Sequence, residues 1–282
     1  MIKLNENNEV VDELLSFLFS KLNEKKMNLS KFRVQKAIFQ IKMDLGENHP
    51  LFNNLPYYWY CFGPFSNFVA DSFNFHEIHD ENNFNIIKEY LPDLDKIITN
   101  LLEDKNYFYN QLHKDIYKKY APFKCMYTFK FELFDTAEKC REIKNKNWLI
   151  NTFYECESQL PFDSYFNEYS DIFSIFITKL SLINEENNLS NNWSILREPI
   201  KRLWYTFAKG LRVQCKDSFY DNMGKQWDLE FNENIKILRS CIDNAEEEIK
   251  NNIAPTKRTS HIYTSAEKRL LNATIGNYLK SD

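Results

Sequence analysis

Basic and aromatic residues alternate along one stretch of the chain, REPIKRLWYTFAKGLRVQCK, at 197–216. Cations in such a pattern could hold phosphates while Trp204, Tyr205 and Phe207 stack on bases. The apolar residues of the same stretch recur at helical spacing, which equally fits an amphipathic helix with its charges in solvent. Nucleic-acid binding is therefore one hypothesis, carried by Arg197, Lys201, Arg202, Lys209, Arg212 and Lys216.

A second stretch, YYWYCFGPFS at 57–66, places a run of aromatic residues before Gly63 and Pro64. Exposed Tyr and Trp rings give a large contact area at little entropic cost, so the stretch could form the lip of a binding surface. The same rings could equally pack into the core behind a fixed turn. Both interpretations stay open at this point.

Other chemistry finds little support in the residue pattern. His76 and His79 could lie one helical turn apart, but no second His or Cys pair at metal-site spacing accompanies them. Arg258 and His261 resemble a nuclease pair but fall in a predicted linker. The chain has five glycines, no Gly-x-Ser-x-Gly elbow and no phosphate-cradling loop. We therefore assign no catalytic residue, no cofactor and no metal ligand.

Composition sets the broad class. The chain has 282 residues, 43% of them hydrophobic, which is enough apolar surface to form a large core. With 36 basic and 40 acidic residues, the net charge of −4 gives no general attraction to nucleic acid or to a membrane. The first residues lack a signal-peptide pattern, so we expect a cytoplasmic protein without a membrane partner. The six cysteines include no Cys-x-x-Cys pair, which predicts reduced thiols.

Hydrophobic periodicity predicts a mainly α fold, with at most a short strand or two. Helices are expected over about 8–26 and from Ser30 to Gly46, followed by an extended segment at 57–62 and a helix beginning at Ser66. The segment 84–104 shows helical spacing on both sides of Pro92, which predicts a kink or two helices meeting there. A further helix is expected at 106–120, and 124–134 alternates like a strand, although a buried helix also fits. The later helices are expected at 136–158, 163–184, 192–222, 226–251 and 265–279.

Two domains are expected from the length: a helical N-terminal domain over 1–122, and a helical C-terminal domain over 123–282. Within the second, 251–265 is the best candidate for a linker, because Pro255 and several Ser and Thr residues interrupt the helical pattern there.

The segment from Phe32 to Phe73 resembles the Panacea domain family, also called the SocA-like antitoxin-associated domain. The family pattern is a Gln-Lys helix, a loop ending in a Leu-Phe pair, and an aromatic segment that closes on Gly-Pro before another helix. Its counterparts here are FRVQKAIFQIK with Gln35 and Lys36, then Leu51-Phe52, then YYWYCFGPFSNFV. Phe62 stands where the family usually has Tyr or His.

This resemblance implies a non-catalytic protein-binding module, antitoxin-like or an accessory subunit of a bacterial, archaeal or phage toxin–antitoxin or defence system. The expected partner is a toxin or another subunit of a defence complex, with nucleic acid as the alternative partner. The expected partner-binding residues are Lys36, Trp59, Tyr60, Phe62, Gly63, Pro64 and Phe65.

Overall fold

The chain is described from a computed structural model, which places residues 2–74, 84–139, 146–185, 192–215 and 217–252. The described residues up to Ala245 belong to one compact unit, and those from Glu246 to Asn252 belong to a second. Most of the described residues are helical, with one short two-stranded sheet. The predicted mainly α fold is confirmed.

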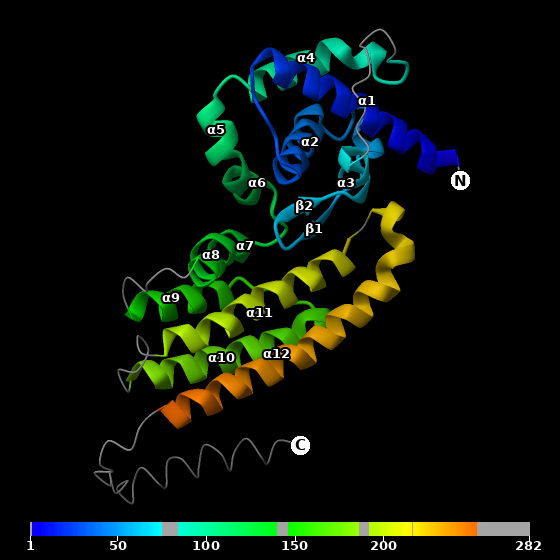
Figure 1. Cartoon of the computed structure of the whole chain (residues 1–282). Helices are drawn as coiled ribbons and strands as arrows, with labels where there is room; N and C mark the ends of the chain where they lie inside the picture. The colour runs from blue at the N-terminus through cyan, green and yellow to red at the C-terminus, as the bar shows by residue number, and fades with distance from the viewer. Residues whose placement is uncertain (1, 75–83, 140–145, 186–191, 216, 253–282) are drawn as a thin grey trace, which may run out of the picture. The chain divides into compact units, whose positions relative to one another are not determined.

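The N-terminal half is built on helices α1 (Ile2–Glu24), α2 (Lys31–Leu45), α3 (Asn67–Asn74) and α4 (Leu91–Leu101), which Figure 1 shows gathered around α2. Helix α1 packs on α3, and α2 packs on both α3 and α4. The buried residues of one hydrophobic cluster all fall between Val10 and Ile116. The apolar residues that recur at helical spacing in the sequence therefore face a common core, as amphipathic helices require.

A β-hairpin follows α2. Strand β1 (Tyr58–Tyr60) pairs antiparallel with β2 (Gly63–Phe65), and Trp59 lies opposite Pro64. The extended segment expected at 57–62 is thus confirmed, but Gly63 and Pro64 open a second strand rather than ending the structure. Gly63 has φ of +88°, a conformation that glycine adopts without strain, and the chain can therefore turn back within two residues.

Pro92 lies in the first turn of a helix, so the kink interpretation is wrong, and the alternative of two helices meeting there is the one that the structure has, although the first is short. Before Pro92 the chain forms only the 3₁₀ turn η3 (Lys88–Tyr90), and α4 starts at Leu91. Proline is well tolerated in a first helical turn, where its missing N–H would have no partner in any case. The helix expected at 106–120 is present as α5 (Lys105–Asn110) and α6 (Leu112–Tyr120).

The segment 124–134 is helical, and the strand interpretation of it is wrong. Helix α7 (Cys125–Thr128) runs into a π-helical segment, η4 (Phe129–Phe134), and then into α8 (Asp135–Glu138). Phe129, Leu133 and Phe134 of the π-helical segment are buried together, and Phe131 is half-buried. Lys130 also points inward, and its Nζ meets Asp135 Oδ1 at 2.6 Å.

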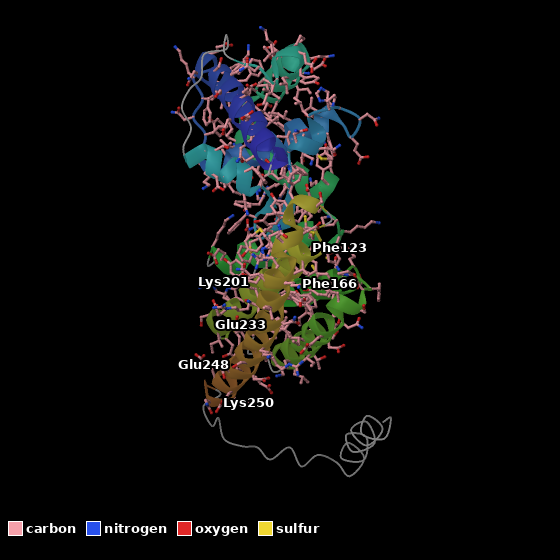
Figure 2. All side chains as sticks on the ribbon, turned by 90° about the vertical axis from the view of Figure 1, so that its right-hand side faces the viewer. Phe123, Phe166, Lys201, Glu233, Glu248 and Lys250 are labelled. Carbon is pink, nitrogen blue, oxygen red and sulfur yellow. The ribbon has the colours of Figure 1, made fainter. Side chains whose placement is uncertain are left out.

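The second half consists of helices, as expected: α9 (Lys146–Glu157), α10 (Asn167–Glu185), α11 (Trp193–Val213) and α12 (Gly224–Asn252), with 3₁₀ turns η5 (Ser164–Phe166) and η6 (Ser218–Met223). The single helix expected at 192–222 is wrong in its extent, because α11 ends at Val213 and η6 is separate from it. Aromatic rings fill the spaces between the helices. Phe153 of α9, for example, lies 5.6 Å from Phe173 of α10 between ring centroids. Figure 2 labels Phe123, which precedes α7, and Phe166 of η5, whose ring centroids are 6.2 Å apart. Within the described part of the chain, no helix combines the length and apolar character needed to cross a membrane.

The proposed division into 1–122 and 123–282 stays a prediction. The compact unit continues through residue 122, although the buried cluster of the first four helices stops at Ile116. The predicted linker at 251–265 begins inside α12, which ends at Asn252. Several other predictions lie outside the described residues. They are the rest of the linker, the helix expected at 265–279, and the pairs His76/His79 and Arg258/His261.

Candidate functional site: an aromatic groove beside the Gly63 turn

A groove of about 350 Å³ lies between the first turns of α2 and the β-hairpin. Aromatic rings provide most of its surface. Two of them are well exposed at its rim, Phe32 with 41% and Phe62 with 49% of their surface accessible. The groove is lined by Lys31, Phe32, Gln35, Lys36, Tyr58, Tyr60, Phe62, Gly63 and Phe65.

Gln35 fixes the far end of the hairpin to α2. Its side-chain amide donates from Nε2 to the Ser66 carbonyl at 2.8 Å, and its Oε1 accepts from the Ser66 N–H at 2.9 Å. Gln35 and Ser66 are both fully buried, so neither backbone group of Ser66 has access to water as an alternative partner. This pair of hydrogen bonds therefore sets how closely the hairpin approaches α2.

Lys36, the next residue, holds the turn of the hairpin. Its Nζ donates to the Pro64 carbonyl at 2.8 Å, and only 4% of the residue is exposed. Burial lowers the pKa of Lys36 to about 7, with a smaller contribution from the nearby charge of Lys130. The neutral amine still carries N–H groups, so the bond to Pro64 does not need the charged form.

Gly63 is required at this turn for space as well as for its backbone angle. A Cβ at this position would lie 2.9 Å from Cε2 of Tyr117 and 3.4 Å from the Lys36 amine. The Tyr117 ring itself is only 1% exposed and has no room to withdraw. The floor of the groove is therefore a tight contact between the turn, α2 and α6.

The hairpin presents different rings on its two faces, as alternation along a strand requires. On one face, Tyr58 packs against Tyr220 and Trp227, with ring centroids 4.8 Å away in both cases. On the other face, Trp59 packs against Tyr117 at 5.2 Å and against Phe39 at 6.2 Å. Trp59 is thus part of the packing between the hairpin and the N-terminal helices.

The second half of the chain also packs against the hairpin, and Figure 1 shows β1 beside α11. The indole Nε1 of Trp204, on α11, donates to the Cys61 carbonyl at 2.9 Å. The Tyr220 hydroxyl, in η6, donates to the Pro56 carbonyl at 3.3 Å. These bonds make the groove a preformed feature, because its strands are fixed to helices on both sides.

Burial keeps the Tyr60 hydroxyl and the Cys61 thiol beside the groove neutral. Burial raises the pKa of Tyr60 to about 12 and that of the Cys61 thiol to about 11. A thiol with a raised pKa is a poor nucleophile near neutral pH. The Arg212 guanidinium lies over the Tyr60 ring, 4.9 Å from its centroid, and is paired with Glu230. The groove is therefore suited to apolar contact.

Most of the residues expected to bind a partner do meet here. Lys36, Tyr60, Phe62, Gly63 and Phe65 line the groove. Trp59 and Pro64 are not among the residues that line it, and their share in any binding stays a prediction.

Four lining residues were missed from the sequence: Lys31, Phe32, Gln35 and Tyr58. Helical spacing was a usable signal for two of them, because Phe32 and Gln35 share a face with Lys36 or border it.

The basic segment of α11 is occupied by intramolecular partners. Arg212 is 8% exposed, and Lys201, labelled in Figure 2, forms an ion pair with Glu198 at 2.9 Å. Glu198 also pairs with Arg202 at 2.9 Å, Lys209 pairs with Glu230 at 3.8 Å, and Arg197 donates to the Ala137 carbonyl at 2.7 Å. Lys216 lies outside the described residues.

The aromatic residues of α11 are also largely unavailable to bases. Trp204 and Phe207 are fully buried, with no accessible surface. Stacking on nucleic-acid bases needs an exposed ring face, which neither of them offers.

Among the described residues, no three or more His, Cys, Asp or Glu side chains are grouped so that they could hold a metal ion. The five described cysteines are free thiols. Comparison of the chain with protein-family models, with curated proteins and with solved structures gives no match. The resemblance to the Panacea domain therefore stays a prediction, and the groove is interpreted from its own geometry.

Proposed function

We propose that the chain is a non-catalytic protein-binding module that receives an apolar segment of a partner protein in the aromatic groove. The observation that carries the proposal is the exposure of Phe32 and Phe62 at the rim of a preformed apolar groove. Large aromatic side chains beside a pocket are the residues that most often dominate the energy of protein interfaces. A groove fixed on both sides also costs little ordering entropy when it binds.

The resemblance of residues 32–73 to the Panacea domain supports a more specific form of the proposal. In that form the protein is a cytoplasmic, antitoxin-like or accessory subunit of a defence system, and the partner is a toxin or another subunit of the complex. The Gln-Lys pair and the Gly-Pro turn would then form the scaffold of the groove, through the bonds from Gln35 to Ser66 and from Lys36 to Pro64.

Nucleic acid is less well supported as a partner. The described cations of α11 are paired with carboxylates or a carbonyl, and the rings Trp204 and Phe207 are inside the core. No geometric observation favours this alternative over the groove.

The test is site-specific photocrosslinking from the groove in cells of the native host. A benzophenone amino acid replaces Phe62, and in the control it replaces Phe162, which is 99% exposed and does not line the groove. We expect one protein crosslinked from position 62 and absent from position 162. Introducing Phe32→Ser should abolish that crosslink, and the complex should persist at high salt because apolar contacts are not screened. Equal crosslinking from both positions would refute the proposal.

A further inference from the structure

A second pocket, separate from the groove, lies on the other side of Phe32. It has a volume of about 220 Å³ and is enclosed by the start of α2, by α5 and α6, and by the π-helical segment with α8. Phe32 and Lys36 contribute to the walls of both the pocket and the groove. The character of the two sites differs, because the groove is apolar and this pocket is rich in charge.

The charge of the pocket is predominantly positive. The described residues that line it include three cations, Arg33, Lys114 and Lys139, one carboxylate, Asp135, and the Lys36 amine, whose pKa is about 7. Asp135 is already engaged, because its two oxygens accept from Lys130 at 2.6 Å and from Lys139 at 2.7 Å. The whole chain has a net charge of −4, so the excess of positive charge is specific to this pocket.

The cations are held above aromatic rings. The Arg33 guanidinium lies 4.8 Å from the centroid of the Tyr109 ring, and the Lys36 amine lies 5.0 Å from that of Phe32. Cation–π contacts position a charge while leaving its N–H groups free to bind an anion. Phe108 and Phe131 add further aromatic surface to the walls.

His113 supplies a polar atom that lacks a partner. Its ring is packed between Phe32, at a centroid distance of 4.9 Å, and Phe131, at 5.1 Å. Burial, followed by the charges of Lys36 and Lys130, lowers the pKa of His113 to about 3, so the imidazole is neutral. Its Nε2 is buried without a hydrogen-bond partner among the described residues. Unpaired buried polar atoms are costly, and a hydrogen-bond donor on a ligand would remove that cost.

From this combination we infer that the pocket binds a small organic anion, with a phosphate or carboxylate head held by Arg33 and Lys114 and a flat ring packed against Phe32 and Phe131. The chemistry of the walls selects both parts of the ligand. Cations recognise the charged head, and aromatic walls favour a planar apolar body. The enclosed volume limits the ligand to a small molecule. The inference does not depend on the proposed protein partner, since the pocket and the groove are distinct cavities.

The test uses phenyl phosphate as the probe, added to the purified full chain without any partner. Binding is followed by the backbone amide signals in ¹H–¹⁵N NMR spectra. We expect saturable binding with a dissociation constant at or below about 1 mM, with shifts centred on α5, α6 and residues 129–135. Phenol, which lacks the charge, and inorganic phosphate, which lacks the ring, should each bind at least about tenfold more weakly.

Matched variants assign the site. Arg33→Gln and Lys114→Gln should each weaken binding about tenfold, as expected for loss of a charge-assisted contact. Lys118→Gln is the control, since Lys118 lies one turn after Lys114 on α6, is exposed and does not line the pocket. It should change binding less than about twofold. Binding weaker than about 1 mM, or equal effects of the three substitutions in folded protein, would overturn the inference.

Discussion

Replacing Lys36 by methionine should remove a specific pH dependence from the stability of the protein. The pKa of Lys36 is lowered to about 7 in the folded chain from an ordinary value of 10.5, mainly by burial. Between these two values the unfolded chain binds a proton that the folded chain does not. The free energy of unfolding of the natural protein therefore rises as the pH rises above about 7. Methionine cannot titrate, so this contribution disappears in Lys36→Met.

The magnitude follows from the two pKa values. Between pH 7.0 and 8.5 the contribution of Lys36 grows by about 1.6 kcal/mol, obtained from the fraction of deprotonated amine at each pH. The window ends at pH 8.5 because the cysteine thiols of the unfolded chain are about half ionised there and the tyrosines follow at higher pH. Since other groups titrate alike in both proteins, the useful quantity is the difference between the natural protein and the variant.

The assay is urea unfolding of both proteins at pH 7.0 and pH 8.5, with Lys118→Met as an exposed control. We expect the difference in the free energy of unfolding between the natural protein and Lys36→Met to increase by about 1.6 kcal/mol over this interval. The same difference between the natural protein and Lys118→Met should stay constant. If the stability of Lys36→Met tracks that of the natural protein at both pH values, the amine is not neutralised by burial and the reasoning is refuted.

Three further substitutions probe the same framework by urea unfolding. Gln35→Met should cost about 1–3 kcal/mol, because it leaves the buried Ser66 N–H without a partner, while the Ser66 carbonyl keeps its bond from the Ala70 N–H. A loss no larger than that of Gln40→Met, whose amide bonds only to the side chains of Asp44 and Tyr120, would contradict this. Gly63→Ala should cost about 2–5 kcal/mol through strain and collision with Tyr117, and more than Gly46→Ala, which has a similar φ of +80° but open space around it. Gly210→Ala should destabilise the protein by about 1–3 kcal/mol, because its Cβ would lie 2.6 Å from a ring atom of Phe166. In the control Gly224→Ala the Cβ meets nothing within 4 Å, so that substitution should be neutral or stabilising. Equal effects of the two substitutions would refute the packing argument.

Helices were predictable from the sequence wherever one apolar face met one core. Val34 and Ile38, four residues apart, are both fully buried on α2, so the period alone locates that helix. The segment 124–134 shows where this approach fails. Its short run alternates like a strand and also fits a buried helix, so periodicity alone left both open, and the structure has the helix, with a π-helical stretch inside it.

The candidate site was only partly predictable for a related reason. An aromatic run identifies rings that will be buried or will bind, but the face each ring takes depends on what packs behind the hairpin. Trp59 turns toward Phe39 and Tyr117, while Phe62 stays at the rim. His113 gave no signal at all, because a single histidine in a helix becomes informative only when its neighbours in space are known.

The bond between Trp204 and the carbonyl of Cys61 joins residues that are 143 positions apart, and that between Tyr220 and Pro56 spans 164. A ribosome adding about 5–20 residues per second needs roughly 7–30 s to make the chain between Cys61 and Trp204. Throughout that interval, the face of the hairpin that carries Tyr58 has no helix to cover it. The groove is consequently among the earliest parts of the protein to be synthesised and among the last to acquire its final support.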